Sequence, residues 1–412
     1  MTRVYDNPSL AGQPVTRALV IGVGAYPRAK EAFAGPTTPQ PLRKVSDLPG
    51  AATGAALFCD WLITNGAQLT PPLASVDLLI NIEAGGQHFS AYSWTNRIAA
   101  PAGGVDPRPD TAVQPPETDL VRDAGTAWMT DLQQGSGNQA IFYICGHGAV
   151  VGPDSLVFLS DLNAFPGNPW GALINVSNHA RAFTQMSSLA SAVFLVDACG
   201  ELVVDLLKVN PGVGAQFAYN DPQNSGEEKV TVLAAAAPGR LTYDGALPDA
   251  PGVRAGRFTQ CLIQGLNGAA VRDITGQGDW SIHPQGLFQD LKALYRLRDD
   301  WVDRPFDPTP PIMPADEFPI LRFVQPPEVP VRVRLAPPQD AQWTFSIHDQ
   351  QDAILRSRAL GAPADWLTSV PASLTPLTFL GVRPGNGSVT ELRLRKAFNP
   401  INGRYDQKMV CP

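Results

Sequence analysis

One histidine and one cysteine stand directly after two apolar runs, and together they could supply a nucleophilic thiol with its base. His147 follows the run 141–146, and Cys199 follows the run 193–198, so the histidine precedes the cysteine by 52 residues. An imidazole can take the thiol proton and later protonate a leaving amine, because its ordinary pKa lies near neutrality. The two residues therefore predict acyl transfer through a cysteine nucleophile.

Glycines flank the histidine. Gly146 and Gly148 remove side-chain bulk from this turn, which frees the Gly148 amide to stabilise a developing oxyanion. The Cys199 amide is the expected second donor of this oxyanion hole. The sequence identifies no side chain that would orient the imidazole, and a backbone carbonyl would suffice. We expect Cys59, Cys145 and Cys261 to be buried as small hydrophobic residues.

The elements that position these residues follow from the apolar patterning. Continuous apolar runs are typical of buried parallel strands, and open α/β sheets carry their chemistry at the carboxyl ends of such strands. Helical spacing alternates with these runs up to about residue 324, and period-two alternation follows from residue 329. Besides 141–146 and 193–198, we expect strands at 17–24, 76–81, 156–160 and 230–237, helices at 50–64, 118–132 (with Thr118 as its cap), 257–266 and 286–298, and an amphipathic segment around 183–189.

This alternation predicts an α/β fold with a mostly parallel sheet flanked by helices, followed by a small β-rich C-terminal domain. The expected divisions are an N-terminal extension (1–16), the α/β domain (17–326) and the β-rich domain (327–412). A polar, turn-rich stretch at 208–229 predicts an exposed loop inside the α/β domain.

Composition narrows the function classes. The net charge of −7 provides no general field for nucleic acid or an anionic membrane, so we expect neither as a partner. The five cysteines form no CxxC pair, which indicates a reducing compartment without a zinc site. No apolar stretch suits a signal peptide or a membrane span, and we therefore expect a cytoplasmic protein.

Taken together, these segments resemble the caspase-like cysteine peptidases, the branch that includes metacaspases and bacterial caspase-like proteins. The resemblance covers roughly 17–324, with 17–207 similar to the large subunit, 208–229 to the linker and 230–326 to the small subunit. The further motifs, in the order of the family, are LPGAATGA (48–55), LVFLSD (156–161), VLAAAAPG (232–239) and GRFTQCLIQGLNG (256–268). The resemblance implies a caspase-like fold with His147 as general base and Cys199 as nucleophile.

The resemblance also implies a substrate pocket. Asp197 and Cys145 would line the S1 pocket, and Asp197 would pair with a substrate Arg or Lys. Cys145 stands where metacaspases often have Ser. The alternative is that Asp197 is a buried structural carboxylate that accepts backbone N–H groups. The chain departs from the metacaspase pattern at Gly54, where a second pocket Asp is usual, and in the Cys-Gly-Glu sequence that begins at Cys199.

The 208–229 loop falls where caspases are cut between subunits. Lys208, Lys229 and Arg240 are therefore candidate processing sites of a zymogen, which implies an activating protease or a regulatory protein as a partner. Some metacaspases need calcium, but no Asp-rich loop of suitable spacing is present, and we expect no cofactor or metal.

These observations predict a cysteine endopeptidase that cleaves protein or peptide substrates, after Arg or Lys if the pocket assignment holds. A role in bacterial defence or regulated death follows only by analogy with the family. The alternative from another class is a caspase-like scaffold that acts as a non-proteolytic binding or regulatory module. A thiol acyltransferase or ligase is a third hypothesis.

Overall fold

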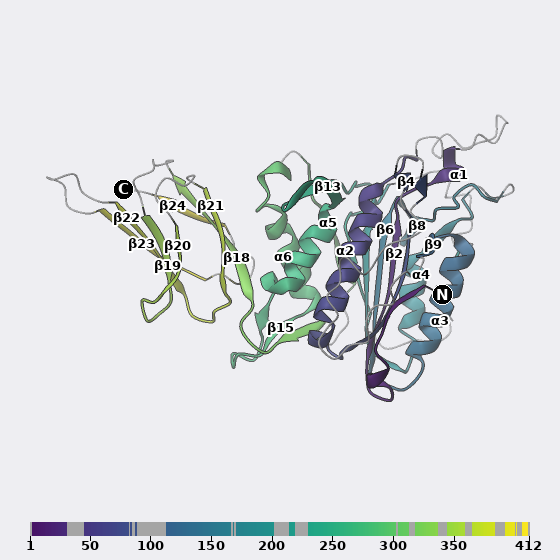
Figure 1. Cartoon of the computed structure of the whole chain (residues 1–412), viewed down its shortest axis with the longest axis horizontal. Helices are drawn as coiled ribbons and strands as arrows, with labels where there is room; N and C mark the ends of the chain where they lie inside the picture. The colour runs from purple at the N-terminus through teal and green to yellow at the C-terminus, as the bar shows by residue number, and fades with distance from the viewer. Residues whose placement is uncertain are drawn as a thin grey trace. The chain divides into compact units, whose positions relative to one another are not determined.

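A computed structural model of the chain forms two compact units, which are described separately (Figure 1). The first comprises Met1–Ile263 with Arg304–Phe318, and the second comprises Gln264–Asp303 with Pro319–Pro412. The structure describes residues 2–30, 45–81, 83–84, 87–88, 113–165, 168, 170–201, 214–218, 230–301, 304–312, 318–336, 344–358, 365–383, 392–399, 401 and 406–410. The first unit contains the two segments predicted to carry the chemistry.

A mixed sheet forms the centre of the first unit. Among the described residues it has seven strands, in the order β1 (Arg3–Asp6), β3 (Leu73–Asn81), β2 (Thr16–Val23), β6 (Asn138–Gly146), β10 (Leu189–Ala198), β11 (Val230–Ala234) and β16 (Thr309–Ile312). The strands from β3 to β11 run parallel, and β1 and β16 pair antiparallel at the two edges. The predicted α/β class is confirmed, but the sheet is only partly parallel. The segment 1–16, predicted as an extension, supplies the edge strand β1.

Helices cover both faces of this sheet, as Figure 1 shows. The predicted helix at 50–64 is α2 (Pro49–Asn65), and it lies on one face together with α5 (Arg257–Gln264). On the other face lie α3 (Thr118–Leu132) and α4 (Val176–Phe183), and a short helix, α1 (Pro27–Lys30), follows β2. Alternate side chains of β6 and β10 pack toward α3 and α4, where the rings of Phe142 and Phe194 lie 5.2 Å apart.

Two local predictions on the α3 and α4 side were wrong. Thr118 is not the cap of α3 but its first residue, and the Asp161 carboxylate accepts its amide N–H at 3.1 Å and its hydroxyl at 3.0 Å. The predicted amphipathic segment at 183–189 is a turn, because the helix there ends at Phe183. That helix begins where the Asn175 side chain accepts the Asn178 amide N–H (2.9 Å), which is a normal helix cap.

Smaller sheets surround the ends of the main strands. They are β7 (Gly148–Val151) with β8 (Asp154–Phe158) and β9 (Leu173–Asn175), β4 (Glu83–Ala84) with β5 (Gln87–His88), and β12 (Asp244–Leu247) with β13 (Ala250–Gly256). The β7–β8–β9 sheet starts directly after His147, and the β12–β13 hairpin follows the segment that passes Cys199. Both therefore border the predicted site.

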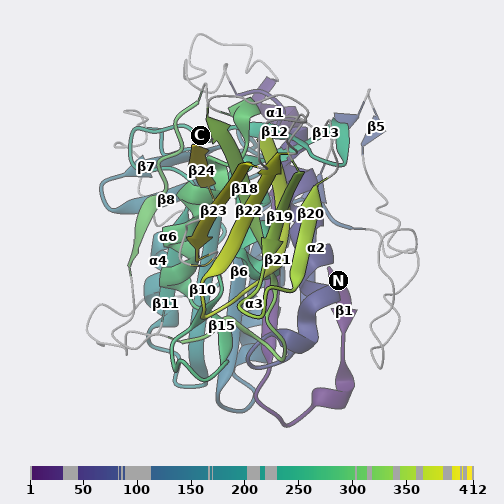
Figure 2. The same cartoon turned by 90° about the vertical axis from the view of Figure 1, so that its left-hand side faces the viewer.

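The second unit begins with short elements and ends in β-sheets. It contains the π-helical turn η6 (Gly265–Ala269), α6 (Pro284–Tyr295), the turn η7 (Asp299–Trp301), and a sheet of β14 (Arg272–Asp273), β15 (Trp280–Ile282) and β17 (Leu321–Phe323). Two further sheets follow, β21 (Asp365–Pro371) with β18 (Glu328–Ala336) and β24 (Asp406–Val410), and β20 (Ile354–Arg358) with β19 (Thr344–His348), β22 (Leu377–Arg383) and β23 (Leu392–Phe398). Figure 2 shows these last four strands side by side.

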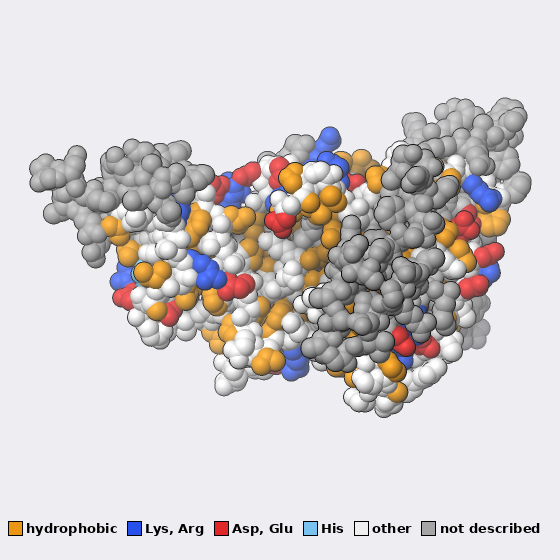
Figure 3. Space-filling view, in the orientation of Figure 1, with side chains coloured by type: hydrophobic (Ala, Val, Ile, Leu, Met, Phe, Trp, Pro, Cys, Tyr) orange, Lys and Arg blue, Asp and Glu red, His pale blue; other side chains and the backbone are white. Residues whose placement is uncertain are grey.

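The β-rich C-terminal region therefore forms the strands expected from its period-two pattern. The buried Arg332 of β18 pairs with Asp299 and Asp365 within this unit. The second unit also includes α6, which the sequence assigns to the α/β domain, so the predicted division at 326 and 327 stays a prediction. On the described surface that Figure 3 shows, acidic and basic side chains are intermixed. Among the described residues, no helix is long and apolar enough to cross a membrane.

Candidate active site

The two predicted catalytic residues follow neighbouring strands of the main sheet. β6 and β10 pair in parallel, with Gly146 opposite Ala198. His147 directly follows Gly146, and Cys199 directly follows Ala198. Both residues are half-buried, whereas the strand residues before them are buried. The sequence separation of 52 residues is thus closed by one pair of adjacent strand ends.

Glycine at position 148 allows this close approach. A Cβ atom there would lie 2.8 Å from the Cβ of Ala198 and 2.8 Å from the carbonyl oxygen of Cys199. The Phe158 amide donates to the His147 carbonyl at 2.9 Å, so the next facing pair, Gly148 and Val157, is of the non-hydrogen-bonded kind. The Gly148 amide is therefore directed away from β8, as the predicted oxyanion donor must be.

Segments near α2 hold His147. Its Nε2 lies 2.9 Å from the Ser46 carbonyl oxygen, and its amide donates to the Tyr26 hydroxyl at 2.8 Å. A carbonyl oxygen only accepts, so Nε2 carries the hydrogen and Nδ1 has the free lone pair in the neutral ring. The orienting group is a backbone carbonyl, which the sequence allowed but could not locate.

The segment after β11 holds Cys199. The Thr242 amide donates to Sγ at 3.4 Å, and Sγ lies 3.8 Å from the Thr242 carbonyl oxygen. Next to it, the Gly200 amide donates to the Arg240 carbonyl at 2.9 Å. These contacts fix the position of the thiol, and the Thr242 N–H favours negative charge on the sulfur.

Burial keeps both groups neutral near pH 7. It raises the pKa of Cys199, and the charges of Asp197, Glu201 and Asp244 raise it further, against the opposing Thr242 hydrogen bond. Burial also lowers the pKa of His147, against the opposing effect of the Ser46 carbonyl and nearby carboxylates. The resting pair is therefore a thiol and a neutral imidazole, in which Nδ1 can act as a base.

Asp197 does not line an open pocket in this structure. It is 2% exposed, and its carboxylate accepts the Thr259 hydroxyl (2.6 Å), the Thr259 amide (3.2 Å) and the Thr242 hydroxyl (3.3 Å). Burial raises its pKa to about 6, the Thr259 hydroxyl opposes this shift, and the Asp244 charge adds to it. Cys145 lies opposite Asp197 in the β6–β10 register and is buried too. The contacts favour the structural alternative for Asp197.

The candidate processing sites are only partly described. Lys208 and Lys229 lie outside the described residues. Arg240 is exposed and lies 3.8 Å from Asp307, but its carbonyl holds Gly200 beside Cys199. Cleavage after Arg240 would cut the segment that carries Thr242, so this bond is a poor site for activation.

Sequence reasoning missed the residues that support the pair. Tyr26, Ser46, Thr242, Asp244 and Thr259 lie far from both motifs in the sequence, and only the fold brings them to the site. None belongs to a spacing that suggests chemistry. One usable signal was the pair of glycines in LPGAATGA, because glycine allows other groups to approach a helix closely.

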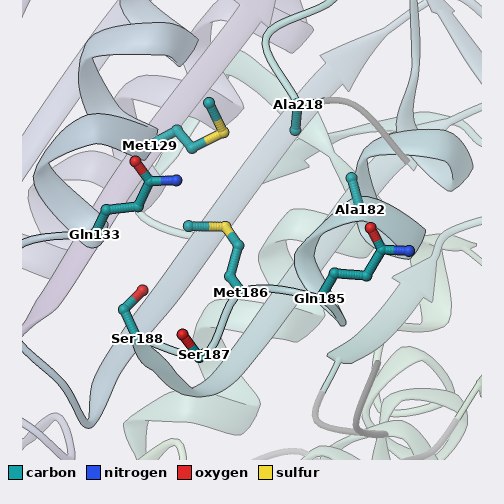
Figure 4. Close-up of a pocket in the computed structure, with 8 residues that line it drawn as sticks. All are labelled: Met129, Gln133, Ala182, Gln185, Met186, Ser187, Ser188 and Ala218. Carbon is teal, nitrogen blue, oxygen red and sulfur yellow. The ribbon is translucent and has the colours of Figure 1, made fainter. Parts of the chain in front are cut away.

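Two cavities lie on the opposite face of the sheet from α2. One, of about 490 Å³, has Met129 and Met186 pointing into it (Figure 4) and is lined by Met129, Gln133, Ala182, Gln185, Met186, Ser187, Ser188 and Ala218. None of these side chains is ionisable. The other, of about 290 Å³, is mostly apolar and lies between α4 and β11. Arg181 is the one ionisable side chain that lines the second cavity. No group of three metal-ligating side chains gathers among the described residues.

No family model matches the chain. A protein of Sinorhizobium fredii, named "Uncharacterized protein y4kE", is 26% identical over 254 residues. The similarity covers 61% of this chain and 64% of that protein, so the chain matches less than two thirds of its relative. The assignment of an activity therefore depends on the residues of the site.

Proposed function

We propose that the protein is a cysteine endopeptidase with a caspase-like arrangement, in which Cys199 is the nucleophile and His147 the general base. One observation carries this proposal. His147 and Cys199 follow directly opposed residues of two parallel strands, and Ser46 and Thr242 hold them on the α2 side of the sheet. A histidine with one nitrogen held by an acceptor and the other free suits a general base.

The chemistry proceeds by acylation and deacylation. His147 Nδ1 takes the thiol proton while Sγ forms a bond to the peptide carbonyl carbon, and the oxyanion forms near the Gly148 amide. The carbon–nitrogen bond then breaks as Nδ1 returns the proton to the leaving amine, which yields a thioester on Cys199. A water molecule gives a proton to Nδ1 and attacks the thioester. The carbon–sulfur bond then breaks as Nδ1 returns this proton to Sγ, which restores the thiol and releases the acid.

A panel of fluorogenic peptides tests the proposal. Wild type should hydrolyse members of the panel, and Cys199→Ala should lose at least about a thousandfold of this activity, because the covalent route is removed. Cys261→Ala is the matched control, since Cys261 is a buried cysteine of α5. It should retain activity within a few-fold.

The same panel separates the alternatives. If Cys199→Ala and wild type are equally inactive while both fold, the non-proteolytic scaffold is favoured and the peptidase proposal is wrong. If products appear only when an amine acceptor is added, the thioester is transferred rather than hydrolysed, and the protein is an acyltransferase.

A further inference from the structure

Asp244 is a carboxylate close to the catalytic pair to which the sequence assigned no role. It begins β12, two residues after Thr242, whose amide contacts Cys199 Sγ. Tyr243 lies between them, with its ring 5.8 Å from the Arg257 guanidinium carbon. Side chains alternate along an extended chain, so the side chains of Thr242 and Asp244 point in one direction and that of Tyr243 points in the opposite direction. The Thr242 hydroxyl donates to Asp197, and this direction is therefore toward the buried interior of the site.

The first turns of α2 leave room for this carboxylate. A Cβ atom at Gly50 would overlap the carboxyl group of Asp244. One helical turn later, a Cβ atom at Gly54 would lie 3.2 Å from the Tyr143 hydroxyl and 3.4 Å from the Thr259 hydroxyl. The helix thus presents a face without side chains to Asp244 and to the groups around Asp197.

The carboxylates of Asp197 and Asp244 differ in the number of hydrogen bonds that they accept. Asp197 is enclosed and has three donors, as described above. The Asp244 carboxylate is half-buried and accepts no hydrogen bond from the described residues. Arg254 and Arg257 donate to its backbone carbonyl at 3.0 and 3.2 Å, and their charges and that of His147 act on the carboxylate without a hydrogen bond to it. A partly desolvated carboxylate without donors is stabilised strongly by a cation that reaches it.

We propose that Asp244 determines specificity by pairing with a basic side chain of the substrate residue whose carbonyl Cys199 attacks. This inference rests on the proposed function. It assigns the preference for a basic P1 residue to Asp244 instead of Asp197. A guanidinium suits the position best, because its planar donors can bind both carboxylate oxygens at once. The charge of Asp244 also acts on both members of the pair, since it raises the pKa of His147 and of Cys199.

The test compares reporters with P1 arginine and P1 citrulline, which have nearly the same shape but differ in charge. In wild type, kcat/KM should be at least about a hundredfold higher for arginine, as expected for a desolvated charge pair. Asp244→Asn should remove most of this ratio by lowering arginine turnover, while citrulline turnover should change no more than it does in Glu201→Gln. Glu201→Gln is the matched control, because it also removes a carboxylate that acts on His147 and Cys199. It should keep the ratio.

Gly50→Ala provides a second variant that keeps the charge and displaces the carboxylate. In this variant the ratio of kcat/KM for the arginine reporter to that for the citrulline reporter should also fall. Thermal unfolding of every variant checks that it folds. If wild type cleaves both reporters equally, or Asp244→Asn and Gly50→Ala keep the arginine preference, the inference is wrong and the peptidase proposal stands. If wild type cleaves neither reporter and Cys199 is not labelled by a P1-arginine electrophile, both are wrong.

Discussion

The Tyr26 hydroxyl accepts the amide N–H of His147 at 2.8 Å, and this contact fixes the turn that carries the imidazole. Tyr26 is fully buried, and its own amide donates to the Asp47 carboxylate at 3.1 Å. The adjacent residue, Ser46, provides the carbonyl that holds Nε2. One short segment before α2 therefore holds the histidine directly through Ser46 and indirectly through Tyr26.

Tyr26→Phe tests this positioning role. It leaves the His147 amide without its acceptor, so we expect a loss of about 1 kcal/mol of folding free energy and about tenfold in kcat. KM should change little, because Tyr26 does not contact the substrate in this mechanism. Tyr295→Phe, which removes a buried hydroxyl donor to Trp301 in the second unit, should affect stability only. Unchanged kcat in Tyr26→Phe would contradict the positioning role.

The neutral resting pair predicts a specific pH dependence. Activity requires neutral His147 and a protonated Cys199 thiol, so kcat/KM should rise with pH through the His147 pKa and fall above the Cys199 pKa. The first lies below the ordinary 6.5 and the second above the ordinary 9.0. Thiolate absorbance, compared between wild type and Cys199→Ala, should show no thiolate at pH 7. A thiolate present at that pH would show that an ion pair forms instead.

Gly148→Ala tests how closely the two turns approach. The added methyl group would meet Ala198 and the Cys199 carbonyl at 2.8 Å. We expect a loss of about 1–3 kcal/mol of folding free energy from overpacking. Peptidase activity should fall by at least about a hundredfold, because a displacement of the turn misaligns the reacting groups. Gly252→Ala, where a Cβ atom has open space, should leave both unchanged. Full activity of Gly148→Ala would show that the turns are not in close contact during catalysis.

Asp197 predicts a pH dependence of stability. Its folded pKa of about 6 lies above the ordinary 3.8, so its stabilising contribution is complete below about pH 3.8 and is lost as the pH rises through 6. Asp197→Asn removes this dependence. Wild type should therefore lose about 2 kcal/mol of unfolding free energy relative to Asp197→Asn between about pH 4 and pH 7.5, measured by urea unfolding. If the difference in unfolding free energy between wild type and Asp197→Asn is the same at both pH values, Asp197 is not a buried carboxylate that takes up a proton in this range.

The proximity of His147 and Cys199 could be predicted because their positions depend on local patterns. The apolar runs before His147 and Cys199 are continuous, which is typical of central parallel strands, and parallel strands bring their carboxyl ends to one edge of a sheet. The helix at α2 was predictable for a similar reason, since its alanines and Leu57, Trp61 and Leu62 follow helical spacing.

The supporting residues could not be predicted because long-range packing decides their positions. Tyr26 follows a strand in a loop, and nothing near it indicates that its hydroxyl reaches a turn 121 residues later. Thr242 and Asp244 lie 43 and 45 residues after Cys199 and reach the site only because the segment after β11 turns back along it. The resemblance to known peptidases drew attention to Asp197 instead, since the motif contains an acid but does not indicate its exposure.

The most direct measurement is covalent trapping of Cys199 by a peptidyl acyloxymethyl ketone, followed by intact mass and peptide mapping. We predict one adduct per chain, located on Cys199, with a labelling rate that falls by at least about a hundredfold in His147→Ala. Labelling that is spread over several cysteines, or that proceeds at the same rate in His147→Ala, would contradict a catalytic pair of Cys199 and His147.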